Sequence, residues 1–260
     1  MTATRSPDIE AGQTAARTAV EISGVSKTYG DGRSAIAALE DVTLTIREGE
    51  FVCLVGASGC GKSTLLNLIA GIYSLDQGAI AVTGRVGLMF QEPALFPWLT
   101  VERNVESAMR FRRAAVDSKR VQELLQIVYL EEFAQRRPHE LSGGMQQRAA
   151  LARALAQDAA VLLMDEPFGA LDAMTRAILH DELERIWQAT GVTVIFVTHD
   201  VREAVRLGDR VILLSSRPGR VVDEVVVDLP RPRQLESPGL GELAQMVTDR
   251  LWQQVRRHVI

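Results

Sequence analysis

The chain is poor in cysteine, in lysine and in long apolar segments. Its 260 residues contain two cysteines, Cys53 and Cys60, seven positions apart and without a second cluster of metal ligands. This pattern argues against a disulfide framework or a zinc site and predicts two free thiols. No segment approaches the roughly 20 consecutive apolar residues that cross a bilayer, and residues 1–20 lack the apolar centre of a secretory signal. We therefore expect the chain to remain in the cytosol.

The charge balance gives no sign of a basic surface. The formal net charge is −4, and lysine accounts for 3 of the 29 basic residues. We therefore expect no nucleic-acid partner, because such domains carry clustered positive charge. Anionic ligands must instead be bound locally, and one of the three lysines, Lys62, lies in the most informative motif. With 47% hydrophobic residues, the chain can bury a substantial core.

Apolar periodicity predicts an α/β domain. Residues 20–22 and 42–46 alternate apolar and polar side chains, as half-buried strands do, whereas Phe51–Val55 is apolar throughout. The latter pattern is typical of a strand buried on both faces of a parallel sheet. Strands and helices alternate again between residues 160 and 214, which favours a parallel sheet covered by helices. Between residues 100 and 133 the spacing becomes helical and predicts an inserted helical subdomain.

The organisation expected from these patterns has three parts. We expect a mobile tail at residues 1–18, a main domain at 19–229 with a helical subdomain at about 94–157, and a C-terminal helical extension at 230–260. The last helix places one apolar stripe along its length. An amphipathic helix normally faces its own core, so we favour packing on this chain over insertion into a partner groove. The stripe consists of Leu240, Leu243, Val247, Leu251 and Val255.

Residues 56–63 fit the pattern G-x-x-x-x-G-K-[ST] between the buried strand and a helix expected at residues 62–70. In such a P-loop, backbone amides and the positive end of the helix dipole bind phosphate oxygens. We expect Lys62 to reach the β- and γ-phosphates of ATP, and the Ser63 hydroxyl to bind Mg²⁺. The predicted ATP-binding residues of this segment are Gly56, Ala57, Ser58, Gly59, Cys60, Gly61, Lys62, Ser63 and Thr64.

Cys60 has two interpretations. It lies at a helix N-terminus, where the acidity of a thiol can be increased, and a redox switch is one possibility. The other is a passive residue that fills the loop. We favour the second because no resolving cysteine is evident nearby in the sequence.

An apolar strand that ends in two acids follows about a hundred residues after the P-loop. Residues 161–164 lead directly into Asp165 and Glu166. A buried strand delivers such carboxylates to its C-terminal edge, where they organise Mg²⁺ and an attacking water beside a P-loop. We expect Asp165 to act on Mg²⁺ through water and Glu166 to polarise the attacking water. Acids after a strand also cap helices, so the pair alone leaves both interpretations open.

Residues 141–148, LSGGMQQR, resemble the signature sequence of ABC ATPases and stand just before the acid strand. From Val20 to Leu229 the chain resembles this family. The resemblance implies an α/β fold with a P-loop NTPase (RecA-like) core, a small antiparallel β subdomain and an inserted α-helical subdomain. The activity implied is ATP hydrolysis coupled to transport across a membrane.

Four single residues occupy positions of further family motifs. The resemblance implies that Tyr29 stacks on adenine and that Gln91 binds Mg²⁺ and relays the state of the nucleotide. It implies that Asp172 lies in a loop that crosses a dimer interface and that His199 is a catalytic switch histidine. Taken singly, these residues could equally be a core aromatic, a turn residue, a helix N-cap and an ordinary histidine. Their joint occurrence in the family order favours the functional interpretation.

The signature segment implies a homodimer. Ser142 can cap a helix whose glycine-rich N-terminus forms a second anion site, which we do not expect to reach the chain's own P-loop. The family resemblance implies that Ser142, Gly143, Gly144 and Gln146 contact ATP bound to the partner subunit. ATP would then favour the closed dimer, and hydrolysis would release it.

The segment QEPALFPWLTVERNV at residues 91–105 resembles the importer branch that handles nitrate, sulfonates and taurine. This implies a location on the cytoplasmic face of the cell membrane, bound to integral membrane permease subunits and served indirectly by an extracytoplasmic solute-binding protein. Phe96 and Trp98 would line a groove for a permease helix, or they would pack at the subdomain boundary.

The alternative is a soluble ABC ATPase of translation or DNA repair. Such proteins usually carry paired cassettes or a long coiled-coil insertion. This chain has one cassette, with 50 residues between Gln91 and Ser142 and no basic patch, which disfavours that alternative.

Overall fold

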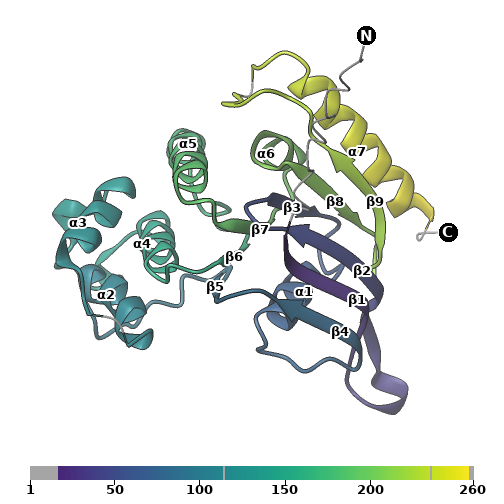
Figure 1. Cartoon of the computed structure of the whole chain (residues 1–260), viewed down its shortest axis with the longest axis horizontal. Helices are drawn as coiled ribbons and strands as arrows, with labels where there is room; N and C mark the ends of the chain where they lie inside the picture. The colour runs from purple at the N-terminus through teal and green to yellow at the C-terminus, as the bar shows by residue number, and fades with distance from the viewer. Residues whose placement is uncertain (1–16, 114, 235, 258–260) are drawn as a thin grey trace, which may run out of the picture.

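The computed structural model describes residues 17–113, 115–234 and 236–257, which form two β-sheets flanked by helices (Figure 1). The smaller sheet is antiparallel and has the order β2-β1-β4. The larger sheet has the order β5-β6-β7-β3-β8-β9; its first five strands are parallel and β9 is antiparallel to β8. The α/β fold expected from the sequence is confirmed. The strands are β1 Thr18–Tyr29, β2 Ile36–Arg47, β3 Phe51–Val55, β4 Gln77–Val82, β5 Val86–Met89, β6 Val161–Asp165, β7 Thr193–Val197, β8 Arg210–Leu214 and β9 Val221–Val226.

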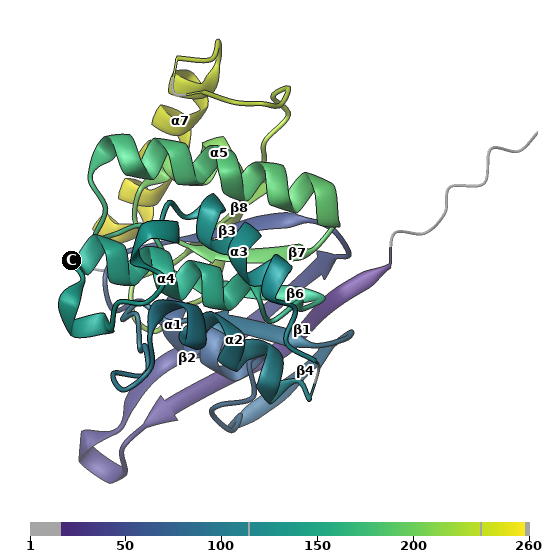
Figure 2. The ribbon, with the colours of Figure 1, turned by 90° about the vertical axis from the view of Figure 1, so that its left-hand side faces the viewer.

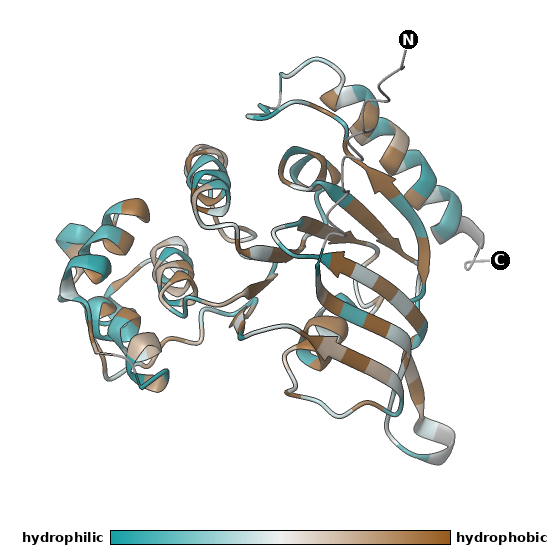
Figure 3. Ribbon diagram, viewed as in Figure 1, coloured by the Kyte–Doolittle hydropathy of each residue, from teal (hydrophilic) through white to brown (hydrophobic). Residues whose placement is uncertain are grey.

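Strand β3 belongs to both hydrophobic clusters of the molecule. Its side chains alternate between the two faces of the sheet, and all five are buried. Phe51, Cys53 and Val55 join the cluster that includes residues of α4 to α7, whereas Val52 and Leu54 join the cluster with α1 and the antiparallel sheet. Because both faces are covered, the strand must be apolar throughout. Figure 3 shows this concentration of hydrophobic residues in the central strands.

The helical part of the chain lies to one side of the sheets (Figures 1 and 2). Helix α2 (Val101–Phe111) packs on both α3 (Ser118–Ile127) and α4 (Gly143–Leu155). These helices fall within the segment where the sequence predicts a helical subdomain. The other helices are α1 Lys62–Ile69, α5 Ala173–Thr190, α6 Val201–Leu207 and α7 Leu240–Arg257.

Side-chain caps fix the starts of three helices close to the nucleotide-binding motifs. The Ser142 hydroxyl accepts a hydrogen bond from the Met145 amide at the start of α4. Asp172 and Asp200 accept backbone hydrogen bonds at the starts of α5 and α6, respectively. These bonds satisfy amides that have no partner within the helix. The helix starts predicted at Asp172 and Asp200 are confirmed.

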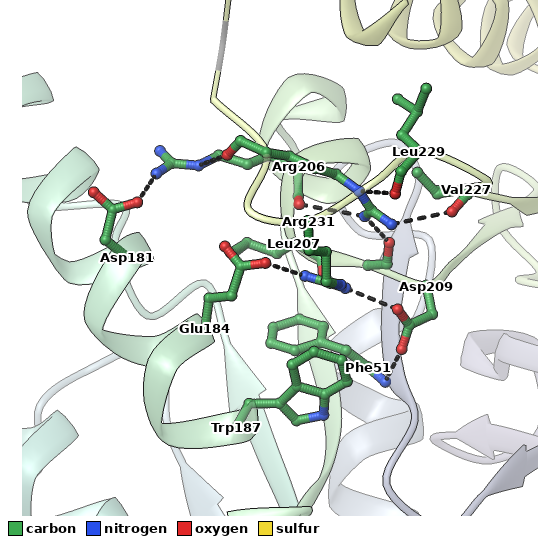
Figure 4. Close-up of polar contacts among 12 residues, drawn as sticks. Phe51, Asp181, Glu184, Trp187, Arg206, Leu207, Asp209, Val227, Leu229 and Arg231 are labelled. Carbon is green, nitrogen blue, oxygen red and sulfur yellow. Dashed lines mark hydrogen bonds and ion pairs between the residues drawn. The ribbon is translucent and has the colours of Figure 1, made fainter. Parts of the chain in front are cut away.

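Two arginines anchor the segment between β9 and α7 (Figure 4). The Arg231 guanidinium lies 2.7 Å from Glu184 Oε1 and 2.8 Å from Asp209 Oδ1, and it stacks 4.4 Å from the ring centre of Trp187. Arg233 is 3% exposed and donates hydrogen bonds only to backbone carbonyls among its described contacts. Both arginines hold the extended segment against α5, α6 and the turn between α6 and β8. The chain therefore reaches α7 along a fixed path.

Helix α7 packs on its own chain. It contacts α6, and Leu240, Ala244 and Val247 are buried in the shared core. Leu243 and Leu251 of the predicted stripe are half-buried against the same cluster. The side chain of Val255 lies outside the described part of the structure. The prediction that the stripe packs internally is confirmed for its described members.

Most of the predicted tail at residues 1–18 lies outside the described residues, and β1 begins at Thr18. Across residues 17–113, 115–234 and 236–257, no helix combines the length and apolarity needed to cross a membrane.

Candidate functional site

The P-loop connects β3 to α1 and depends on the absence of side chains at two glycines. Gly61 caps α1 with φ 101°, and a Cβ there would lie 2.7 Å from the Ala38 carbonyl oxygen. A Cβ on Gly56 would lie 2.7 Å from Cys60 Sγ and 3.0 Å from the Leu214 carbonyl oxygen. The loop therefore takes this shape only with glycine at these positions.

Lys62 directs its ammonium group into the concave side of the loop. Its Nζ donates hydrogen bonds to the carbonyl oxygens of Gly56, at 2.9 Å, and Ala57, at 3.1 Å. The side chain is buried, so the charge is concentrated within the loop. A buried cation beside the N-terminus of α1 makes this a site for an anion.

Asp165 ends β6 with a carboxylate suited to a cation. Its Oδ1 atom is buried and has no hydrogen-bond partner among the described residues. Burial raises the pKa of Asp165, whereas a hydrogen bond from Ser63 lowers it; the Glu166 carboxylate raises it further and Lys62 opposes this. A buried carboxylate oxygen without a partner is costly, and a cation would remove that cost. The residues present therefore fit a Mg²⁺ ion held near Ser63 and Asp165.

Glu166 and His199 face each other at the same edge of the sheet. Glu166 has φ 45°, a left-handed conformation, and its N–H donates to the Val197 carbonyl at 3.0 Å. Its Oε2 lies 3.3 Å from His199 Nδ1. The two side chains that the sequence analysis predicts to be catalytic are therefore brought together, although they are 33 positions apart in the chain.

One cavity of about 380 Å³ unites most of the predicted ATP-binding residues. Segments from the antiparallel sheet, the P-loop, the start of the helical part and the acid strand all contribute to it. Its lining residues are Tyr29, Ile36, Ala38, Ser58, Gly59, Gly61, Lys62, Ser63, Thr64, Gln91, Glu166 and Arg217. Such a convergence of polar groups in one concave site is the expected form of a binding site.

Tyr29 lies at the rim of this cavity. Its ring is 38% exposed and stands edge-on to Tyr73, with the ring centres 6.0 Å apart. Its hydroxyl is 3.5 Å from Thr64 Oγ1. The alternative that Tyr29 is a core aromatic is therefore wrong, because the ring faces the cavity instead of the core.

Three lining residues, Ile36, Ala38 and Arg217, are absent from the sequence-based prediction. Ile36 and Ala38 belong to β2, and Arg217 belongs to the loop after β8. A signal for Arg217 does exist in the sequence, because it follows a buried apolar strand of the same α/β pattern. The carboxyl ends of parallel strands meet at one edge of a sheet, and ligands bind there.

The signature residues lie at the N-terminus of α4, and none of them lines this cavity. Gly143 has open space around the position of a Cβ, whereas Gly144 lies against Leu171. The Gln146 amide donates to the carbonyls of Pro138 and Leu141, so that nitrogen is engaged within its own chain.

Gln147, which the sequence analysis does not single out, connects the signature helix to the cavity. Its Nε2 donates a hydrogen bond of 3.4 Å to the Gln91 carbonyl. The backbone of Gln91 and the first turns of α4 are therefore in direct contact.

Asp172 serves as the N-cap of α5. Its carboxylate accepts hydrogen bonds from the Thr175 N–H and hydroxyl, at 2.9 and 2.7 Å. These two bonds, the amide first, lower the pKa of Asp172. The capping role considered for Asp172 is thus present, and the carboxylate also remains at the surface.

The surroundings of Cys60 fit the favoured interpretation, a passive residue that fills the loop, and oppose the alternative of a thiol made more acidic by the helix N-terminus. The side chain is 1% exposed, and burial raises its pKa although Lys62 Nζ lies 3.8 Å from Sγ. Desolvation of the thiolate therefore exceeds the effect of the nearby cation. Both cysteines are buried free thiols, and Cys60 fills the space beneath the loop.

A second cavity, of about 480 Å³, lies between the larger sheet and the helical part. Phe96 lines it, together with Phe90 and Phe111. Trp98 does not line it; its side chain is 68% exposed, and its ring centre lies 5.5 Å from that of Phe96. Phe96 therefore lines the groove and also packs at the boundary between the helical part and the sheet, so both predicted roles apply to it. Trp98 lies beside the groove and is exposed to solvent.

Comparison with known proteins agrees with this geometry. Residues 39–169 match the family described as ABC transporter. The chain is 45% identical over 229 residues to the aliphatic sulfonates import ATP-binding protein SsuB of Bacillus licheniformis, covering 85% of this chain and 89% of the relative. It is 45% identical over 221 residues to the nitrate import ATP-binding protein NrtD of a Synechocystis species, covering 81% and 83%.

The fold also resembles solved structures. A dimeric ATP-binding cassette in a post-hydrolysis state, bound to ADP and Pi, has a TM-score of 0.75 and 37% identity, covering 81% of this chain and 100% of that one. The matched family segment contains the P-loop, the signature helix and the acid strand described above. The chain belongs to the ABC transporter family.

Proposed function

We propose that this chain is the ATP-binding and ATP-hydrolysing subunit of a membrane ABC importer, and that it energises uptake of a small anion such as a sulfonate, taurine or nitrate. The observation that carries the proposal is the cavity in which Tyr29, the P-loop, Gln91 and Glu166 meet. Each group has a task in phosphoryl transfer, which depends on positioning and electrostatic stabilisation. Residues 19–229 would form the ATPase domain, with the helical subdomain at about 94–157 and the extension at 230–260.

Within the cavity, Tyr29 would contact adenine, and Lys62 would exchange its two carbonyl partners for phosphate oxygens. Ser63, Gln91 and Asp165 would hold Mg²⁺, the last through water. The ion, when bound, would neutralise part of the phosphate charge. Glu166 would polarise the attacking water, and His199, 3.3 Å away, would orient that carboxylate.

The signature residues support a homodimer. Ser142, Gly143 and Gly144 are outside their own chain's cavity, and the space around Gly143 is open. The helix N-terminus they form would bind the γ-phosphate of ATP held by the partner subunit, with Gln146 beside it and Asp172 near the interface. ATP would thereby stabilise the closed dimer, and its hydrolysis would open it.

The second cavity supports attachment to a permease on the cytoplasmic face of the cell membrane. Trp98 is 68% exposed and Phe111 is 75% exposed beside an apolar groove. Exposed aromatic side chains around a groove mark a site for a partner helix. An extracytoplasmic solute-binding protein would take part only indirectly. The names of the relatives favour this importer over a soluble ATPase of translation or DNA repair.

The test combines enzymology with growth. The purified chain should hydrolyse ATP in the presence of Mg²⁺, and a strain lacking the gene should fail to grow on an alkanesulfonate, on taurine or on nitrate as sole sulfur or nitrogen source. Growth on sulfate and ammonium is the control. An active ATPase with normal growth on all three substrates would contradict the proposed class of transported substrate. A chain without ATPase activity would contradict the proposed ATP hydrolysis.

A further inference from the structure

The loop between β8 and β9, residues 215–220, packs directly against the P-loop. Gly219 lies so close to the Cys60 carbonyl oxygen that a Cβ would overlap with it. The Gly219 N–H donates to the Ala38 carbonyl at 2.9 Å, and its own carbonyl accepts from the Glu40 N–H at 3.0 Å. This loop is therefore fixed between the P-loop and β2.

Ser215 fixes the shape of the same loop from within. Its hydroxyl donates to the Pro218 carbonyl at 2.8 Å and accepts from the Arg220 N–H at 2.9 Å, and the side chain is buried. A buried hydroxyl with both partners in one short loop restricts the backbone on either side of Arg217. Arg217 is thus presented from a defined backbone position.

Arg217 extends from this loop into the cavity that contains Lys62. Its Nε donates a hydrogen bond of 3.2 Å to the Gly59 carbonyl, and its Nη2 lies 3.0 Å from where a Cβ of Gly59 would be. A larger residue at position 59 would displace the guanidinium. The Arg217 side chain therefore packs on the P-loop at Gly59.

The charge of Arg217 is not neutralised by a carboxylate in the described part of the chain. Its neighbour Arg220, in the same loop, turns away and pairs with Glu40 at 2.6 Å. Arg210, at the start of β8, pairs with Glu50 and Glu224. A guanidinium has five N–H donors, and the contact with Gly59 uses the one on Nε. Arg217 lines the cavity, and its two terminal nitrogens have no hydrogen-bond partner among the described residues.

We propose that Arg217 binds a phosphate group of the nucleotide, as a second cation beside Lys62. The inference rests on the proposed nucleotide-binding function. The hydrogen bond to Gly59 holds the side chain, and the terminal nitrogens form a planar pair of donors, which suits a phosphate. Because the ligand is held by charge on an exposed side chain, the contribution depends on ionic strength.

The test compares two substitutions in one loop, Arg217→Gln and Arg220→Gln, with wild type. Both remove a positive charge and keep an amide donor. ATP affinity is measured by titration at about 50 mM and 500 mM salt, across which the Debye length shortens severalfold. We expect R217Q to weaken ATP binding about fivefold at low salt and much less at high salt, and R220Q to bind as wild type does.

A loss in R217Q that is equal at both salt concentrations, no loss at all, or an equal loss in R220Q would overturn the inference. The variant Lys62→Ala distinguishes a failure of the Arg217 proposal from a failure of the proposed nucleotide-binding function. If K62A binds ATP as wild type does, the nucleotide site itself is wrong. If K62A loses ATP and R217Q does not, the site stands and only the role of Arg217 is wrong.

Discussion

His199 Nδ1 and Glu166 Oε2 lie 3.3 Å apart, across an edge of the sheet formed by β6 and β7. Glu166 reaches this position through a left-handed backbone, φ 45°, which residues other than glycine adopt rarely. Two backbone hydrogen bonds hold it there, from the Glu166 N–H to Val197 and from the Gly169 N–H to Glu166. The carboxylate is therefore positioned by the backbone and oriented by the histidine.

Replacing Glu166 with Gln should separate binding from hydrolysis. The amide keeps the shape of the side chain but cannot accept a proton from water, so we expect ATP turnover to fall by about 10²- to 10⁴-fold while ATP still binds. The closed dimer should then accumulate. Size-exclusion chromatography with light scattering in ATP measures it, and a sample that stays monomeric would contradict the proposed cycle.

Replacing His199 with Ala should reduce ATP turnover and leave ATP affinity within about twofold of wild type, because the ring contacts Glu166 and lies outside the P-loop. Steady-state hydrolysis and nucleotide titration check the two quantities separately. A large loss of ATP affinity with unchanged turnover would place the histidine in binding instead of catalysis.

Replacing Asp165 with Asn should stabilise the nucleotide-free chain while it abolishes hydrolysis. Burial raises the pKa of Asp165 above its unfolded value, so ionisation at neutral pH costs folding free energy. This cost shrinks as pH falls through the folded pKa and is absent below the unfolded pKa. Removing this buried charge, of which the Oδ1 atom has no partner among the described residues, should gain about 1 kcal/mol, or roughly 2–4 °C in melting temperature.

Differential scanning fluorimetry at pH 7 without nucleotide measures this gain. Addition of Mg²⁺ and ATP should reverse the order of stability, since the cation would use the carboxylate of the wild type. A lower melting temperature for D165N without nucleotide would show that the hydrogen bond from Ser63 outweighs the cost of burying the charge.

Cys60 should react slowly with alkylating agents. Its pKa is raised by burial in the folded chain, so the thiolate fraction is lower than in the unfolded chain at every pH near neutrality. Burial of the neutral thiol therefore has no electrostatic cost to folding below the unfolded pKa. Folding stability is lost as pH rises from the unfolded pKa through the folded pKa. Mass spectrometry after iodoacetamide at pH 7.5, with and without denaturant, checks the rate. Fast labelling of the native chain would restore the redox interpretation.

Replacing Arg231 with Ala should destabilise the chain strongly. The substitution leaves Glu184 buried without its cationic partner, and such a loss typically lowers the free energy of unfolding by about 3–5 kcal/mol. Replacing Arg220 with Ala removes the exposed pair with Glu40 and should change the stability far less. Urea denaturation of both variants measures the difference. Equal losses would mean that the buried pair at Arg231 contributes no more than a surface pair.

The strands that the sequence analysis missed share one property. β4, β5 and β9 are all edge strands in their sheets. An edge strand has a neighbour on one side only. β4 is also largely exposed, and β9 has a single buried residue, so neither needs the continuous apolar run that identifies β3 and β6. β5 has four residues, one of them glycine, which is too short for periodicity to be visible.

The residues of the candidate site also differ in how far the sequence predicts them. The P-loop, the acid pair and the signature segment could be predicted because each combines special residue types at fixed local spacing. For Arg217 the sequence offers only its position after an apolar strand. Its place beside Gly59 depends on the parallel pairing of β8 with β3 and on the loop that follows. The contact of Gln147 with the Gln91 carbonyl likewise depends on tertiary packing.

The close approach of Gly219 to the Cys60 carbonyl also limits how this chain can recombine with its homologues. A crossover between these two positions would join a P-loop from one parent to a hairpin from another. If the second parent carried any side chain at position 219, that side chain would push the Cys60 carbonyl out of place and open the phosphate cradle. Viable hybrids should therefore inherit glycine at position 219 together with this P-loop.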